Sequence, residues 1–298
     1  MDTLTTECRL LCASTAAYGI QADGTLQRHS PYYDAAGFES PPIPLVAGVD
    51  DIDACLVGTN ADGVVVAFRG TLPPHHAHPR VLVDWLNDAD TLPVEVPGIP
   101  GAVHRGFWNS LDSLWAPVVV EIVRQRRRSD GAILPVYLTG HSKGGALAHL
   151  AAMRLLRWEN IHPAGVYTYA SPHAGDVDFA AGYQAEGLCS VRYEYQDDLV
   201  PHVPPSAPFL EILRKIPGLG SELGPIAHFD YRPVGTLRFI DWSGTIVGDS
   251  PALEVRRLAK LLERMLLLQY ARIAKDHFAT CGGGYLTAVC PSGVCLLT

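Results

Sequence analysis

The sequence predicts an α/β fold, with a mostly parallel central sheet flanked by helices. Two observations lead to this prediction. Short apolar or β-branched runs alternate along the chain with longer segments of helical periodicity. The 298 residues are 48% hydrophobic and 18% charged, which is an ordinary globular mixture. With no internal repeat and no low-complexity tract, we expect one domain over residues 1–298.

Five runs have the length and composition of buried strands. The run at 64–68 reads Val-Val-Val-Ala-Phe, and β-branched residues favour the extended backbone. The other four runs lie at 135–139, 165–170, 190–195 and 236–242. Helical patterns separate several of these strands, and this alternation indicates parallel pairing with helices on both faces of the sheet.

Three segments predict helices. Residues 108–126 place apolar side chains on one side and end in arginines, whose positive charge suits a helix C-terminus. Residues 146–158 form a second helix. A third begins at Ser250 and Pro251, because a hydroxyl at the N-cap and a proline in the first turn are typical of a helix start.

Charge and cysteine usage exclude several classes of protein. The net charge of −8 opposes binding to nucleic acid, because phosphate recognition needs a basic face. No apolar run approaches the roughly 18 residues of a membrane-spanning helix. The N-terminus lacks the basic region of a secretory signal, so we expect a cytoplasmic protein, with a trimmed signal or another secretion route as the alternative.

The cysteines and histidines indicate no metal site and no cofactor. Seven scattered cysteines without a C-x-x-C pair are expected to be free buried thiols, although Cys281, Cys290 and Cys295 lie close enough in sequence for one bridge. The histidines at 75, 76 and 78 have no acidic or sulfur ligand nearby, which favours a surface loop.

The strongest chemical signal is the segment Gly140-His141-Ser142-Lys143-Gly144. It matches G-x-S-x-G and lies between a predicted strand and a predicted helix, where this motif forms a sharp turn. The turn requires small residues two positions before and after the serine, and it exposes the serine hydroxyl. The sequence therefore predicts Ser142 as a nucleophile.

A serine nucleophile needs a histidine base and an acid that orients the histidine. In proteins with this serine turn, the acid follows the serine in the chain and the histidine follows the acid. Spacing alone leaves Asp197 and Asp198 open, with Asp176 and Asp178 as weaker rivals. Among the later histidines, His277 follows the last predicted core strand and the long helix, and it is favoured over His228.

Seven short motifs in a fixed order resemble the class 3 lipases, which are fungal-lipase-like α/β-hydrolases. The resemblance covers roughly residues 60–290. The motifs are Phe68-Arg69-Gly70-Thr71, Asp84-Trp85-Leu86-Asn87-Asp88, Val103-His104-Arg105-Gly106-Phe107, the serine turn, Thr168-Tyr169-Ala170-Ser171-Pro172, Asp198-Leu199-Val200-Pro201 and Tyr231-Arg232-Pro233-Val234-Gly235.

The resemblance implies a role for each matching residue. The aspartate before Leu-Val-Pro is the family's acid, which selects Asp198. The family's histidine lies near the C-terminus in an Asp-His stretch with a tyrosine after it, which supports His277. The family's oxyanion hole implies the backbone N–H groups of Thr71 and Lys143 as donors.

One residue and one loop depart from the family pattern, and a second loop fits the alternation of strands and helices badly. Lys143 stands where the relatives usually have leucine and places a cation beside the nucleophile. The segment 72–80 occupies the position of a lid but is short and rich in histidine and proline. The segment 204–226 is an insertion or cap candidate, and its apolar residues predict an acyl-chain wall. The residues predicted for that wall are Phe209, Leu210 and Leu213.

The sequence thus predicts a serine hydrolase that cleaves carboxylic esters, with a lipase acting on acylglycerols as the first choice. Its partner would be an ester or lipid substrate, including one at a lipid–water interface. The alternatives within the class are a phospholipase A1 and a soluble carboxylesterase such as a feruloyl esterase. A non-catalytic scaffold is the least favoured alternative, because every group that catalysis requires is present.

Overall fold

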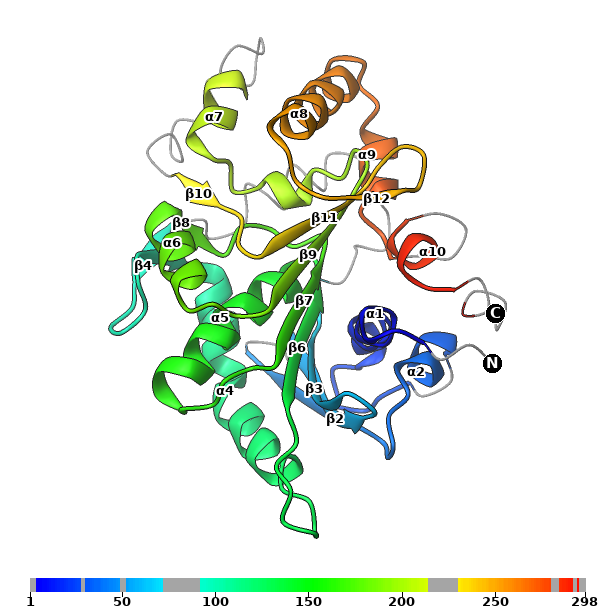
Figure 1. The fold of residues 1–298 in the computed structure, drawn as a ribbon, viewed down its shortest axis with the longest axis vertical. Coiled ribbons are helices and arrows are strands. Elements are labelled where there is room, and N and C mark those ends of the chain that lie inside the picture. Colours follow the sequence, from blue (N-terminus) through cyan, green and yellow to red (C-terminus); the bar gives the residue numbers. More distant parts are fainter. Residues whose placement is uncertain are drawn as a thin grey trace.

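A computed structural model describes residues 4–27, 30–48, 52–71, 92–213, 230–279, 284–291 and 294. An eight-stranded sheet runs through its centre in the order β1-β2-β3-β6-β7-β9-β11-β12, with helices on both faces (Figure 1). This arrangement confirms the predicted α/β-hydrolase class of fold.

The five central strands are parallel and coincide with the five predicted runs. They are β3 (Gly63–Phe68), β6 (Val136–His141), β7 (Gly165–Tyr169), β9 (Ser190–Tyr195) and β11 (Thr236–Ile240). Their pairings are parallel throughout. Because Phe68 pairs with Gly140 and His141 pairs with Tyr169, the carboxyl ends of β3, β6 and β7 meet at one edge of the sheet.

Antiparallel strands extend the sheet at both sides. The strands β1 (Ile43–Ala47) and β2 (Asp53–Asn60) continue from β3, and β12 (Ile246–Val247) pairs with β11. A second sheet joins four short strands. They are β4 (Pro93–Glu95), β5 (Ala102–His104), β8 (Gly175–Asp176) and β10 (Tyr231–Arg232).

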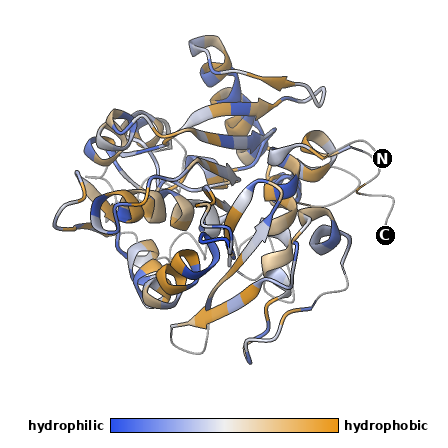
Figure 2. Cartoon of the chain, turned by 60° about the horizontal axis from the view of Figure 1, so that its bottom comes forward, coloured by the Kyte–Doolittle hydropathy of each residue, from blue (hydrophilic) through white to orange (hydrophobic). Residues whose placement is uncertain are grey.

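One face of the sheet is covered by α4 (Arg105–Gln125), α5 (Lys143–Trp158) and α6 (Val177–Ala185). The first two confirm the helices predicted at 108–126 and 146–158. Leu111, Leu114 and Val118 of α4 are buried against apolar strand residues, as their spacing requires. In Figure 2 the strands carry orange stretches beside white and blue ones, and every residue of β3 is buried, as in a sheet covered on both sides.

The opposite face is covered by segments from the two ends of the chain. These are α1 (Thr6–Ala16), the short helix η1 (Ala17–Gly19), α2 (Pro31–Ala36) and α10 (Tyr285–Val289). Leu10 and Leu11 of α1 are fully buried in the same cluster as Tyr285. The N-terminal and C-terminal segments therefore share one half of the core.

A third group of helices lies beyond the carboxyl ends of the strands (Figure 1). It contains η3 (Val200–His202), α7 (Ala207–Leu213), α8 (Pro251–Leu266) and α9 (Tyr270–Asp276). The helix predicted to begin at Ser250 is confirmed, because the Ser250 hydroxyl accepts from the backbone N–H of Leu253. A small cluster built on Leu199, Phe209, Leu261 and Ile273 joins these elements.

The lid-like segment 72–80 lies outside the described residues, as does the part of 204–226 that follows residue 213. Within the described ranges, no helix combines the length and apolar character that crossing a membrane requires.

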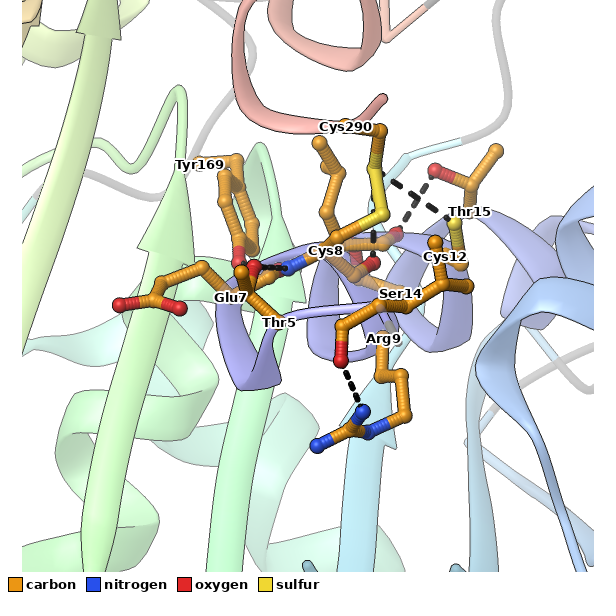
Figure 3. Close-up of a disulfide and its surroundings, with 11 residues drawn as sticks. Thr5, Glu7, Cys8, Arg9, Cys12, Ser14, Thr15, Tyr169 and Cys290 are labelled. Carbon is orange, nitrogen blue, oxygen red and sulfur yellow. Dashed lines mark hydrogen bonds between the residues drawn. A yellow bond between two sulfur atoms is a disulfide. The ribbon is translucent and has the colours of Figure 1, made fainter. Parts of the chain in front are cut away.

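A disulfide between Cys8 and Cys290 corrects the expectation that the cysteines are free. Cys8 and Cys12 lie one turn apart on α1 and both face Cys290 (Figure 3). Cys8 and Cys290 are 282 residues apart in the sequence, so their spacing did not indicate that they pair. Cys12 and Cys55 are free and buried, as expected, whereas Cys189 is free and exposed. Cys281 and Cys295 lie outside the described residues.

The disulfide yields a prediction about stability. Replacing Cys8 and Cys290 together by alanine should lower the free energy of unfolding by about 2–5 kcal/mol, because the bridge closes almost the whole chain into a loop in the unfolded state. Urea denaturation of the double variant measures this loss. The matched control is Cys189→Ala, which removes an exposed free thiol. An unchanged midpoint in the double variant would contradict the prediction.

Candidate active site

The turn between β6 and α5 holds Ser142 in a backbone conformation that few residues adopt. Its φ is 57° and its ψ is −134°, and it is the N-cap of α5. A Cβ at Gly140 would lie 2.1 Å from the carbonyl oxygen of Gly144, and a Cβ at Gly144 would lie 2.1 Å from that of Phe68. The motif thus needs glycine at both flanking positions, because β3, β6 and α5 approach each other too closely for any side chain there.

The structure brings together the predicted nucleophile, base and acid. The Ser142 hydroxyl lies 2.9 Å from Nε2 of His277. Nδ1 of His277 lies 3.1 Å from each carboxylate oxygen of Asp198. All three side chains are buried. They come from the carboxyl end of β6, the loop after β9 and the end of α9, which is the arrangement that lets a histidine take the serine proton.

Asp198 is held as a carboxylate by its neighbours. It accepts hydrogen bonds from the Tyr285 hydroxyl at 2.7 Å and from the backbone N–H of Val200 at 3.0 Å. Burial alone would raise the pKa of Asp198, but the charge of His277 and these hydrogen bonds outweigh burial and lower the pKa. Sequence reasoning noted Tyr285 only as part of a motif, and its contact with the acid emerges from the fold.

The rival acids are engaged elsewhere. Asp197 accepts hydrogen bonds from the indole N–H of Trp242 and from Arg264, each at 2.8 Å. Asp176 caps α6 by accepting from the backbone N–H of Phe179 at 2.8 Å. Asp178 is exposed on the first turn of the same helix. The rival base, His228, lies outside the described residues.

His141 and Tyr18 support the His277 backbone. Nε2 of His141 lies 2.7 Å from the carbonyl oxygen of His277, and its Nδ1 lies 2.8 Å from the Tyr18 hydroxyl. A carbonyl can only accept, so Nε2 carries the proton and Nδ1 accepts from Tyr18. Burial, together with the adjacent His277, lowers the pKa of His141 to about 3, so the ring is neutral.

The two proposed oxyanion donors stand at neighbouring strand ends. Thr71 follows β3, and Lys143 is the first residue of α5, after β6. The N–H groups in the first turn of a helix have no intrahelical partner, so that of Lys143 is available to a substrate oxygen. Because β3 and β6 are paired, both residues lie at the same edge of the sheet as Ser142.

The predicted acyl-chain wall is more deeply buried than expected. Phe209 and Leu210 are each only 2% exposed, and Phe209 packs in the cluster that joins α7 to α8 and α9. As they stand, these two side chains belong to the packed interior. The side chain of Leu213 is not among the described residues. A role in substrate binding for these residues therefore stays a prediction.

No group with metal-ligand spacing lies at this site among the described residues. The one such group there is Cys8, Cys12 and Cys290, whose sulfur atoms lie within 4.8 Å of one another. Two of these sulfurs are joined in the disulfide, so the trio does not provide three thiolate ligands.

Asp276, next to His277, is a third acidic side chain at the site. Its carboxylate accepts a hydrogen bond from the backbone N–H of Asp197 at 3.3 Å. Burial raises the pKa of Asp276 to about 6, and the negative charges of Asp197 and Asp198 contribute to the increase.

Comparison with known proteins identifies relatives of the chain. The family profile described as Lipase (class 3) matches residues 65–207. A lipase of Rhizomucor miehei is 30% identical over 154 residues, which are 50% of this chain and 40% of that protein. Phospholipase A1-II 3 of Oryza sativa subsp. japonica is 29% identical over 198 residues, covering 54% of this chain and 45% of that protein. The chain thus matches less than half the length of these relatives.

Solved structures agree on the fold. The native Rhizomucor miehei lipase propeptide complex superposes with a TM-score of 0.59 and 22% identity, over 81% of this chain and 68% of that one. The structure of a mutant form of MDLA from Penicillium cyclopium has a TM-score of 0.58 and 22% identity, over 80% of this chain and 81% of that one.

Asp276 gives a prediction about pH and stability. Its pKa is higher in the folded protein than the ordinary value near 3.9, so the folded state binds the proton more tightly. Its contribution to stability is therefore present below about pH 4 and is lost as pH rises through 6. The wild type should lose about 1–2 kcal/mol of unfolding free energy relative to Asp276→Asn between pH 4 and 7.

Urea denaturation of both proteins at each pH measures this difference. Asparagine keeps the oxygen that accepts from Asp197 but cannot ionise. The variant Asp178→Asn, at an exposed carboxylate, is the control and should show a nearly constant difference. A constant difference for Asp276→Asn as well would refute the assignment.

Proposed function

We propose that the chain is a member of the class 3 lipase family and a serine hydrolase of carboxylic esters, with acylglycerols as its preferred substrates. The observation that carries the proposal is the continuous line of hydrogen bonds from Ser142 through His277 to Asp198, with distances of 2.9 and 3.1 Å. A buried carboxylate, an imidazole and a hydroxyl in this order suit acyl transfer.

The proposed reaction begins at the serine hydroxyl. Ser142 attacks the ester carbonyl carbon while Nε2 of His277 takes the hydroxyl proton. Asp198 stabilises the imidazolium that forms and keeps Nδ1 protonated. The backbone N–H groups of Thr71 and Lys143 donate to the oxyanion, and the positive end of α5 favours the same charge.

The second half of the proposed reaction regenerates the hydroxyl. His277 passes its proton to the departing alkoxide, which leaves as an alcohol while the acyl group stays on Ser142. A water molecule then attacks this ester while His277 accepts a proton from the water. Collapse of the second tetrahedral intermediate returns the proton to Ser142 and releases the carboxylic acid. Apart from this water molecule, the groups that act in these steps are side chains and backbone of the described site.

Two features support action at a lipid–water interface. Leu266, Leu267 and Leu268 are consecutive and are 64%, 57% and 72% exposed, which is unusual for large apolar side chains. Leu266 ends α8 and the other two follow it before α9, which leads directly to His277. Arg272 and Lys275 on α9 are also exposed, and such basic groups suit the phosphates of a lipid surface.

A phospholipase A1 is the second candidate. The rice relative carries that name, and its match covers 54% of this chain, against 50% for the fungal lipase. Both activities cleave a carboxylic ester with the same proposed groups. Release of fatty acid from emulsified triacylglycerol, compared with release from phosphatidylcholine vesicles, separates them.

The disulfide is also relevant to the compartment in which the protein is located. The cytoplasmic location expected from the sequence stays a prediction. The Cys8–Cys290 bridge favours the alternative, an oxidising compartment, because disulfides persist there and are rare in the cytosol.

The nucleophile is tested by Ser142→Ala. We expect turnover of p-nitrophenyl esters to fall by about six orders of magnitude, because a triad without its nucleophile retains only binding and oxyanion stabilisation. The wild type should be labelled by a fluorophosphonate, and the variant should not. Ser171→Ala, at a buried serine whose hydroxyl donates to the carbonyl oxygen of Pro172, is the matched control and should keep labelling.

The base is tested by comparing two histidine variants. His277→Ala should lose activity on the same scale as Ser142→Ala, while His228→Ala should retain it. An active His277 variant beside an inactive His228 variant would reverse the assignment. A wild type that the fluorophosphonate does not label would instead favour the non-catalytic scaffold.

The exposed leucines are tested by Leu266→Glu combined with Leu267→Glu. The rate on emulsified tributyrin should fall about tenfold or more, because burying even one leucine in lipid contributes about 1.5–3 kcal/mol. The rate on dissolved p-nitrophenyl acetate should be unchanged. Val120→Glu, at an α4 position that is 63% exposed, is the control. Equal losses on both substrates would show that the leucines serve folding, not an interface.

A further inference from the structure

The side chain of Lys143 on α5 forms an ion pair with Asp53 of β2. Its ammonium donates to Oδ1 of Asp53 at 2.7 Å and to the Ser110 hydroxyl at 3.3 Å. The side chains of Lys143 and Asp53 are only 13% and 8% exposed. The cation that the sequence places beside the nucleophile is therefore neutralised within the protein and does not extend freely into solvent.

The fold makes room for the carboxylate of Asp53. It is the first residue of β2, and its Oδ2 accepts from the Ser113 hydroxyl at 3.2 Å. Gly48 faces it with a φ of 86°, and a Cβ there would lie 2.6 Å from Oδ2. Glycine is thus needed at position 48 for both its backbone conformation and its lack of a side chain.

A second cation lies on the same side of the site. Burial lowers the pKa of Arg69, and the negative charge of Asp53 opposes this effect by stabilising the guanidinium. The guanidinium donates to the carbonyl oxygens of Ile20 and Ile52, each at 2.7 Å. Arg69 precedes Thr71 by two residues, and Lys143 is the other proposed oxyanion donor. The buried carboxylate of Asp53 therefore stabilises two cations, Lys143 and Arg69. One lies in each of the two segments that supply the proposed oxyanion donors.

We propose that Lys143 is a positioning residue: its ammonium compensates the buried carboxylate of Asp53, and without an unpaired charge beside it the first turn of α5 keeps the place from which the Lys143 backbone N–H can donate to the substrate oxyanion. The pair also prevents an uncompensated carboxylate from opposing the negative charge that develops there. This inference rests on the proposed ester hydrolysis and adds a role for a side chain that the triad does not use.

The physical reason is the cost of a buried, unpaired charge. Removing one partner of a buried ion pair leaves the other without compensation, whereas removing both charges together is often neutral. The usual leucine of the family needs no acidic partner at position 53. Lysine at 143 and aspartate at 53 consequently act as a unit, and their effects on the reaction should not be additive.

The experiment compares the wild type with Lys143→Leu, Asp53→Asn and the double variant on p-nitrophenyl butyrate. We expect Lys143→Leu to lower kcat about tenfold with little change in KM, a fraction of the loss caused by removing a whole oxyanion donor. The double variant should recover to within about threefold of Asp53→Asn. A double variant as impaired as Lys143→Leu, or an unchanged kcat in Lys143→Leu, would overturn the proposal.

The acid limb of the kcat/KM profile against pH is a readout that a purely structural role would not move. This limb reports protonation of the free enzyme's base, His277. Lys143→Leu leaves a negative charge and should shift the limb to higher pH, while Asp53→Asn leaves a positive charge and should shift it to lower pH. The ionisable groups near His277, namely Asp198, His141 and the adjacent Asp276, are the same in all variants.

A matched control separates this role from general stability. Arg9 and Asp62 form another partly buried ion pair at 2.6 Å, between α1 and the turn after β2. Arg9→Leu should lower the melting temperature without changing kcat or the acid limb. If Lys143→Leu does not fold, the acid limb of the kcat/KM profile is compared between Asp53→Asn and the double variant. This comparison tests the proposal, because only Asp53→Asn leaves an unpaired charge. A wild type without esterase activity would instead count against the proposed function itself.

Discussion

The arrangement of the site depends on one backbone constraint, the tight turn that carries Ser142. Its positive φ is tolerated because β3, β6 and α5 close around it, with glycine at the two positions where a side chain would collide with backbone. The same closeness places the first turn of α5 beside the end of β3. The positions of the proposed nucleophile and of both proposed oxyanion donors thus follow from the packing of three elements.

The remaining residues of the site come from parts of the chain that are distant in sequence from Ser142. His277 follows α9, 135 residues after Ser142, and its carbonyl oxygen is held by His141 of the turn itself. Tyr285 of α10 reaches back to Asp198. The disulfide joins the residue after α10 to α1, so the two ends of the described chain pack against the core that supports the proposed base and acid.

Three of the buried carboxylates around the site have compensating partners. Asp198 is matched by His277 and Tyr285, Asp197 by Arg264 and Trp242, and Asp53 by Lys143. Such matching is what a low-dielectric environment demands, because an isolated buried charge is very costly. It also leaves the site with carboxylates that are held in place and with His277 in hydrogen-bond contact with the Ser142 hydroxyl.

Local sequence was sufficient for the central strands, for α4, α5 and α8, and for the nucleophile turn, because hydrophobic periodicity, N-caps and glycine spacing act over a few residues. The choice between Asp197 and Asp198 needed family resemblance. Only the tertiary structure decided which carboxylate faces His277, that Cys8 meets Cys290, that Phe209 is packed inside, and that Lys143 is tied to Asp53. These are contacts between residues tens to hundreds of positions apart. Such contacts exist only once the sheet has set its strand order, and no local pattern encodes them.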